Sequence, residues 1–143
     1  MASGVMPLAY EGILKGMKIT KLEHATLVLE QGGDTAVIDP GSYTRPLTGL
    51  SNVRAIVMTH MHDDHCFEEQ IDCIVAENSD ALLFGTDGVR KRLAESRPNL
   101  KVTSVHHGDF HKVGEFTFEF FGDMHAEIHR SIPLIQNCGV MVN

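Results

Sequence analysis

Four side chains able to bind a metal ion fall within six residues, directly after the most apolar segment of the chain. That segment, Val53–Met58, is aliphatic at five of its six positions, which is typical of a strand buried on both faces. In open α/β sheets, ligands gather at the carboxyl ends of the strands. We therefore expect the H-x-H-x-D-H loop that follows to lie at such an edge. Its sequence is Thr59-His60-Met61-His62-Asp63-Asp64-His65.

The spacing within this loop indicates a metal site. His60 and His62 leave an extended backbone on the same side, so both can bind one ion. Asp64 and His65 follow where the chain turns, and they can reach a second ion nearby. Imidazole and carboxylate ligands with an open position are usual for catalytic zinc, although they also suit iron and manganese. Chance would produce this pattern in only about 0.2% of chains with the same composition.

The remaining chain alternates short apolar segments with two helical patterns. Phe116, Phe118 and Phe120 alternate with polar residues, as expected of a half-buried strand. Strands with intercalated helices, opened by hairpins, predict an α/β fold with a sheet of mixed direction. We expect helices at 68–77 and 87–96, and strands at 19–22, 26–30, 35–38, 53–58, 81–84, 102–105, 115–121 and 138–142.

The length of 143 residues is enough for one domain. Residues 1–16 contain three glycines and a proline without a sustained period. We expect them to be a poorly ordered extension or a cloning remnant, and residues 17–143 to form the domain.

The composition of the chain limits the classes of partner that the protein can bind. A net charge of −7 without a basic stripe is a poor match for nucleic acid or anionic lipid, and no run of eighteen apolar residues predicts a membrane span. Cys66, Cys73 and Cys138 lack C-x-x-C spacing, which favours reduced, mostly buried thiols in a cytoplasmic protein. We therefore expect a small-molecule substrate in the cytoplasm.

The motif and its context resemble the metallo-β-lactamase-fold hydrolases, in particular the small cytosolic branch that includes ascorbate-phosphate lactonase-like enzymes. The supporting segments are the H-x-H-x-D-H loop, the opening strand from Met17 to His24, the strand that ends in Asp39-Pro40-Gly41, and Phe121-Gly-Asp-Met-His125. The resemblance implies an αββα sandwich with mixed sheets. It also implies that His60, His62 and His125 bind the first ion and that Asp64 and His65 bind the second. Zinc is the expected metal, as one or two ions, with Mn²⁺ and Fe²⁺ as alternatives.

Other histidines compete with His125 for the first site. They are His106, His107, His111 and His129. His24 and Asp39 could lie near the metals, but each could equally be an ordinary residue at a strand end.

The resemblance implies a hydrolase that uses a metal-bound hydroxide on an ester, lactone, amide, thioester or phosphodiester. Asp64 would orient the nucleophile and then pass a proton to the leaving group. His62 replaces the glutamate of the diiron oxygen-reducing branch, which disfavours redox chemistry. A nuclease of the same fold and a metal-binding protein without catalysis are the alternatives, and the acidic charge argues against the nuclease.

The family pattern continues past Asn143. Residues 137–143 match the strand before the carboxylate that bridges the two metals in the family. We therefore expect residues 17–143 to be the N-terminal portion of the fold, with a second site left with Asp64 and His65 only. An apolar face without its cover would then promote a homodimer or aggregation.

Overall fold

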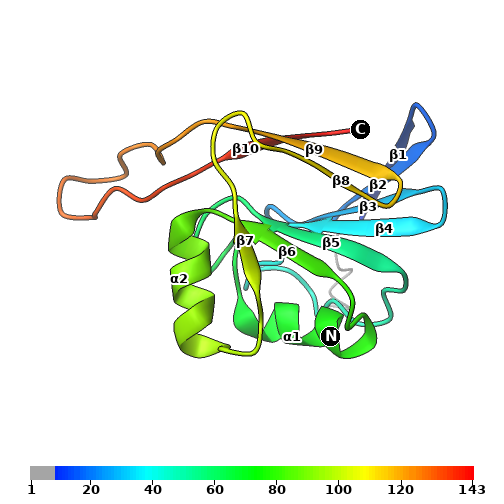
Figure 1. Ribbon diagram of the computed structural model, residues 1–143, viewed down its shortest axis with the longest axis horizontal. Coiled ribbons are helices and arrows are strands. Elements are labelled where there is room, and N and C mark those ends of the chain that lie inside the picture. The colour runs from blue at the N-terminus through cyan, green and yellow to red at the C-terminus, as the bar shows by residue number, and fades with distance from the viewer. Residues whose placement is uncertain (1–8) are drawn as a thin grey trace, which may run out of the picture.

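A computed structural model describes residues 9–143 as two stacked β-sheets with two helices on one outer face (Figure 1). The larger sheet has seven strands in the order of the sequence. They are β1 (Tyr10–Leu14), β2 (Met17–Lys21), β3 (Leu27–Gln31), β4 (Asp34–Ile38), β5 (Val53–Met58), β6 (Leu82–Gly85) and β7 (Val102–Ser104).

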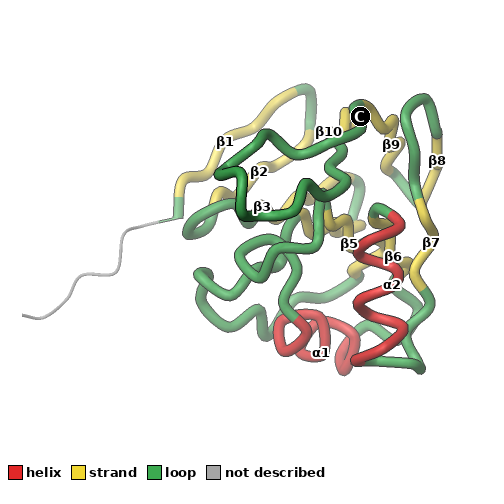
Figure 2. Tube along the Cα trace, turned by 90° about the vertical axis from the view of Figure 1, so that its left-hand side faces the viewer, coloured by secondary structure: helices red, strands yellow, loops and turns green. Residues whose placement is uncertain are grey.

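The smaller sheet has three strands in the order β10-β9-β8. They are β8 (Phe110–Val113), β9 (Phe116–Phe121) and β10 (Gly139–Val142). Within residues 9–143 no helix covers the outer face of this sheet (Figure 2). The predicted mixed α/β fold is confirmed.

Strand direction changes in the middle of the larger sheet. Strands β1 to β4 are antiparallel. Two-residue turns permit this direction, as at Gly32-Gly33 between β3 and β4, where both φ angles are positive. Strands β4 to β7 are parallel. Parallel neighbours need a crossover, which the helices provide between β5 and β6 and between β6 and β7. The carboxyl ends of β4 and β5 therefore meet at one edge.

Helices α1 (Glu68–Glu77) and α2 (Asp87–Ser96) pack their apolar sides on the larger sheet. Val89 and Leu93, one turn apart, are both fully buried. The Thr86 hydroxyl accepts a hydrogen bond from the Val89 amide and caps the start of α2. No helix of the described residues is long and apolar enough to cross a membrane.

The core between the sheets is built on alternate residues of β9. Phe116, Phe118 and Phe120 have no exposed surface and pack against residues of the larger sheet such as Phe84. Burying each ring contributes about 2–3 kcal/mol. This core fixes the small sheet over the large one, and so positions the loop between β9 and β10.

Two strands differ from the predictions. Tyr10–Leu14 pairs with β2 through a turn at Lys15-Gly16, although no strand was predicted there. Residues 1–8 lie outside the described part of the chain, and the extension expected at residues 1–16 stays a prediction. Every side chain of β1 is exposed, which removes the alternation that would have marked it. Strand β8 was not predicted either, because only Val113 of its four residues is buried.

Candidate metal centre

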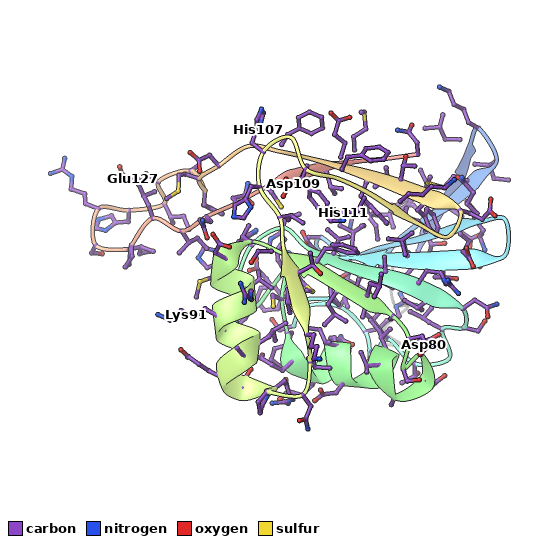
Figure 3. The ribbon with its side chains drawn as sticks, viewed as in Figure 1. Asp80, Lys91, His107, Asp109, His111 and Glu127 are labelled. Carbon is purple, nitrogen blue, oxygen red and sulfur yellow. The ribbon has the colours of Figure 1, made fainter. Side chains whose placement is uncertain are left out.

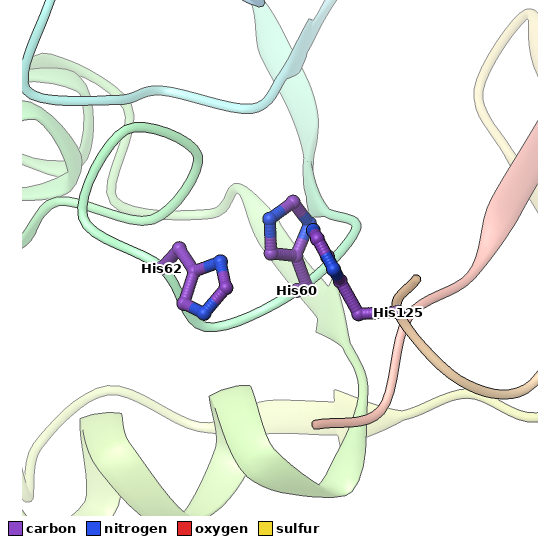
Figure 4. A group of neighbouring side chains, drawn as sticks. All are labelled: His60, His62 and His125. Carbon is purple, nitrogen blue, oxygen red and sulfur yellow. The ribbon is translucent and has the colours of Figure 1, made fainter. Parts of the chain in front are cut away.

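Three imidazoles converge at the carboxyl end of β5. His60 and His62 lie on the loop after that strand, and His125 comes from the loop between β9 and β10 (Figure 4). The ring centroids are 4.8–5.0 Å apart, and each residue has a ligand atom within 4.8 Å of those of the other two. The His125 amide donates to the Ile135 carbonyl at 2.8 Å, which ties the two sides of the β9–β10 loop together. The structure thus brings together the three residues expected at the first site.

The most buried of the three is suited to bind a cation. His60 is 4% exposed, and burial, followed by the charge of nearby His65, lowers its pKa to about 4. Its imidazole is therefore neutral at pH 7, which is the form that ligates metals. A set of three converging imidazoles fits a divalent ion.

The Asp39 carboxylate orients the imidazole rings of His60 and His65 through hydrogen bonds. One carboxylate oxygen, Oδ1, accepts from the Thr59 amide, while Oδ2 accepts from the Thr59 hydroxyl and from His65 Nδ1, at 2.7–2.8 Å. Because the hydroxyl donates to Asp39, its oxygen accepts from His60 Nδ1 at 3.0 Å. Both histidines are thereby left with Nε2 as the free ligand atom. The hydrogen bond to Asp39 also raises the pKa of His65.

A second group lies beside the first. It consists of His24, Asp64 and His65, whose ligand atoms are all within 4.8 Å of one another. The His60 and His65 ring centroids are 4.1 Å apart, so the two groups adjoin. Burial opposes ionisation of Asp64, but the hydrogen bond from His24 and the charge of His65 lower its pKa. His24 was left open by the sequence, and the structure places it here.

Two residues that were not identified as site residues from the sequence hold residues 59–65, the metal-site loop, in place. Arg92 of α2 pairs with Glu68 and with Asp63 at 2.8 Å and donates to the Met61 carbonyl. Gly41 approaches the loop so closely that a Cβ there would lie 1.8 Å from the Asp64 carbonyl oxygen. The Asp39-Pro40-Gly41 turn was a sequence signal for the contact of Gly41 with the loop. No local pattern in the sequence predicted the contacts of Arg92.

The competing histidines lie elsewhere. His107 lies between β7 and β8, and His111 lies on β8 (Figure 3). His107 Nδ1 accepts from the Gly122 amide, and His111 packs on the Phe84 ring. His106 pairs with Asp87, and His129 bonds to Ser131. Among the described residues none of these four joins either group.

All three cysteines are free, as expected. Cys66 and Cys138 are buried, whereas Cys73 is half-buried. Burial raises the pKa of Cys66 to about 12 and that of Cys138 to about 11, so both thiols stay protonated at neutral pH.

The stacked sheets and the histidine loop define a class of metal-binding α/β sandwich, and comparison with known proteins names it. The sequence model of the beta-lactamase superfamily domain matches residues 18–142, so the chain belongs to this superfamily. The predicted metallo-β-lactamase-like family and fold are confirmed.

Known proteins resemble the chain in sequence or in fold. The chain is 30% identical over 126 residues to Protein Rv0786c of Mycobacterium tuberculosis, covering 88% of this chain and 57% of that protein. A protein described as a metal-dependent hydrolase from Parabacteroides distasonis shares the fold, with a TM-score of 0.76, 21% identity, and coverage of 94% of this chain and 61% of that one. The metallo-beta-lactamase fold protein YhfI from Bacillus subtilis has a TM-score of 0.60 and 15% identity, over 95% of this chain and 55% of its own. The chain thus spans about three fifths of the length of these relatives.

Proposed function

We propose that the protein is a metal-dependent hydrolase, with zinc as its metal, that acts on an ester, lactone, amide or phosphodiester of a small molecule. One observation supports this above all: His60, His62 and His125 converge as one group, and this group adjoins the second group, which contains the carboxylate of Asp64. Three free thiols support a cytoplasmic location.

The residues of the site would have separate roles in the reaction. His60, His62 and His125 would hold the ion, which when bound supplies a water that ionises near neutral pH and polarises a substrate oxygen. The side chain of Asp64 is 30% exposed, so its carboxylate is accessible from solvent. It would orient the attacking water and pass the proton it receives to the leaving group. Asp39 and Thr59 would hold the rings of His60 and His65 in the ligating tautomer.

Metal analysis combined with a screen of ester, lactone and phosphodiester substrates tests this proposal. The wild-type protein should bind at least one equivalent of zinc and hydrolyse a member of these classes. His60→Ala should bind at least one equivalent of zinc fewer than the wild type and lose the hydrolysis, whereas His129→Ala, which changes a histidine outside both groups, should keep both properties. Less than half an equivalent of metal, with His60→Ala unchanged in every assay, would contradict the proposal.

The same experiment separates the enzyme from its alternative. Full zinc binding without turnover of any substrate class would identify a metal-binding protein that does not catalyse hydrolysis.

A further inference from the structure

We propose that His24 is the third protein ligand of a second metal site, together with Asp64 and His65. This inference rests on the proposed function only in placing metal ions at this edge of the sheet. The resemblance that suggested the metal site gave the second ion Asp64 and His65 alone, and nothing in the sequence selected His24.

The distances suit one ion. His24 Nε2 lies 2.7 Å from Asp64 Oδ2, and His65 Nε2 lies 3.5 Å from the same oxygen. Ligands of a tetrahedral ion with bonds near 2.1 Å are about 3.4 Å apart, so small movements would place all three around one cation. A bound ion would replace the shared proton of the His24–Asp64 hydrogen bond.

The backbone around His24 is built to present its ring. His24 has a φ of +56°, in the left-handed region, which residues other than glycine rarely adopt. Its carbonyl accepts from Lys21 Nζ, and the Leu22 amide donates to the Thr26 carbonyl at 3.0 Å, which closes the turn. The Tyr43 ring packs edge-on against the imidazole at 5.2 Å.

Neighbouring contacts hold the same turn in place. Glu23 pairs with the Arg45 guanidinium at 2.7 Å and accepts from the Thr44 hydroxyl at 3.0 Å. The residue next to His24 is thus tied to the loop after β4. A strained conformation persists where its surroundings determine it, and such positions cluster at functional sites.

Charge and access also fit a catalytic ion. The group contributes one carboxylate and two imidazoles, a ligand set that suits a divalent cation. The side chains of His24, Asp64 and His65 are 40%, 30% and 20% exposed, so the outer side of the group is open to solvent and to substrate. Within residues 9–143 no other histidine, cysteine or carboxylate joins the group, so His24 is the third ligand that this part of the chain offers.

The decisive variant is His24→Asn. Asparagine tolerates the left-handed backbone, and its shorter side chain removes the imidazole ligand. His24→Gly, which also accepts a positive φ, serves as a second variant, and His129→Ala is the matched control. Zinc stoichiometry is measured by elemental analysis after equilibrium dialysis. Titration with Co²⁺, followed by its visible spectrum, measures the two affinities separately, and circular dichroism checks the fold.

The wild-type protein and His129→Ala should bind two equivalents of zinc. Both His24 variants should keep the first and bind the second at least about tenfold more weakly. Two equivalents with unchanged affinity in the His24 variants would overturn the inference, as would a wild-type protein that binds only one. Two equivalents that depend on His24, but without hydrolysis of any substrate, would contradict the proposed function and leave this inference standing.

Discussion

At the scale of single residues, the site depends on a carboxylate that would not itself touch a metal. Asp39 is 5% exposed and accepts hydrogen bonds from His65 and twice from Thr59, which in turn accepts from His60. Asp39 therefore sets the tautomer of one histidine in each metal group.

Asp39→Asn should weaken zinc binding by about 10–100-fold, because the amide nitrogen cannot accept the bonds that a carboxylate oxygen accepts. Competition with a chromogenic chelator measures the affinity. Asp80→Asn, at a loop far from the site (Figure 3), is the control. Equal affinities in all three proteins would show that Asp39 does not position the ligands.

Gly41 provides a steric test of the same region. An added Cβ would lie 1.8 Å from the Asp64 carbonyl oxygen and 2.3 Å from its carbon, and this backbone can yield only by moving the loop. Gly41→Ala should therefore lower the free energy of unfolding by about 3 kcal/mol and weaken the Asp64 site. Urea denaturation measures the first effect. Gly12→Ala, where no atom lies within 4 Å of the added Cβ, should show no comparable loss.

At the scale of elements, an ion pair joins the two helices to the metal-site loop. Both nitrogens Nε and Nη2 of Arg92 on α2 donate to the Glu68 carboxylate at the start of α1, at 2.8 Å each. The same guanidinium bonds to Asp63 in the loop. Arg92 therefore connects helix packing to the position of the ligands.

This pair should make stability depend on pH. The Arg92 guanidinium lowers the pKa of Glu68 to about 2, below its ordinary value of 4.5. The pair's contribution, about 2 kcal/mol, is then complete above pH 5 and is lost as the pH falls towards 2. Urea denaturation between pH 6 and pH 3 should show this loss, and Glu68→Gln should reduce the slope.

Glu69→Gln is the matched control for that series, because Glu69 lies exposed in the same helical turn. An identical slope in the wild type and in Glu68→Gln would mean that the ion pair does not couple folding to pH.

At the scale of the whole molecule, the outer face of the small sheet exposes apolar side chains. Phe110 and Met141 flank Glu119 in the register of β8, β9 and β10, and they are 61% and 47% exposed. Phe121 continues the same face at 38% exposure. Contiguous apolar patches of this kind mark interaction surfaces.

We expect this face to mediate self-association between copies of the chain. Light scattering at micromolar concentration should give a mass above 15.8 kDa, and the double variant Phe110→Lys/Met141→Lys should return it to the monomer value. The new lysines would lie beside Glu119 and remove the apolar contact. A wild-type protein that stays monomeric would exclude this surface as a dimer interface.

Local patterns in the sequence were sufficient to predict several elements and most residues of the metal-site loop. The bounds of β5, α1 and α2 follow from apolar spacing and from boundary signals such as Pro98, because burial on a sheet imposes its period on the sequence. His60, His62, Asp64 and His65 were identified for the same reason, since they act from one short loop.

Tertiary structure alone decided the rest. The strands β1 and β8 carry no clear periodic signal, because every side chain of β1 is exposed and only Val113 of β8 is buried. The sequence left open whether His24 lies near the metals, and the fold places it beside Asp64, forty residues away. Nothing in the sequence placed Arg92 against the loop. The resemblance favoured His125 over four other histidines, but its position beside His60 and His62 depends on how the small sheet stacks over the large one. The sequence by itself determined the family and the metal-binding loop. The folded chain determined which distant side chains complete the site, because contacts across a sheet edge leave no periodic trace along the chain.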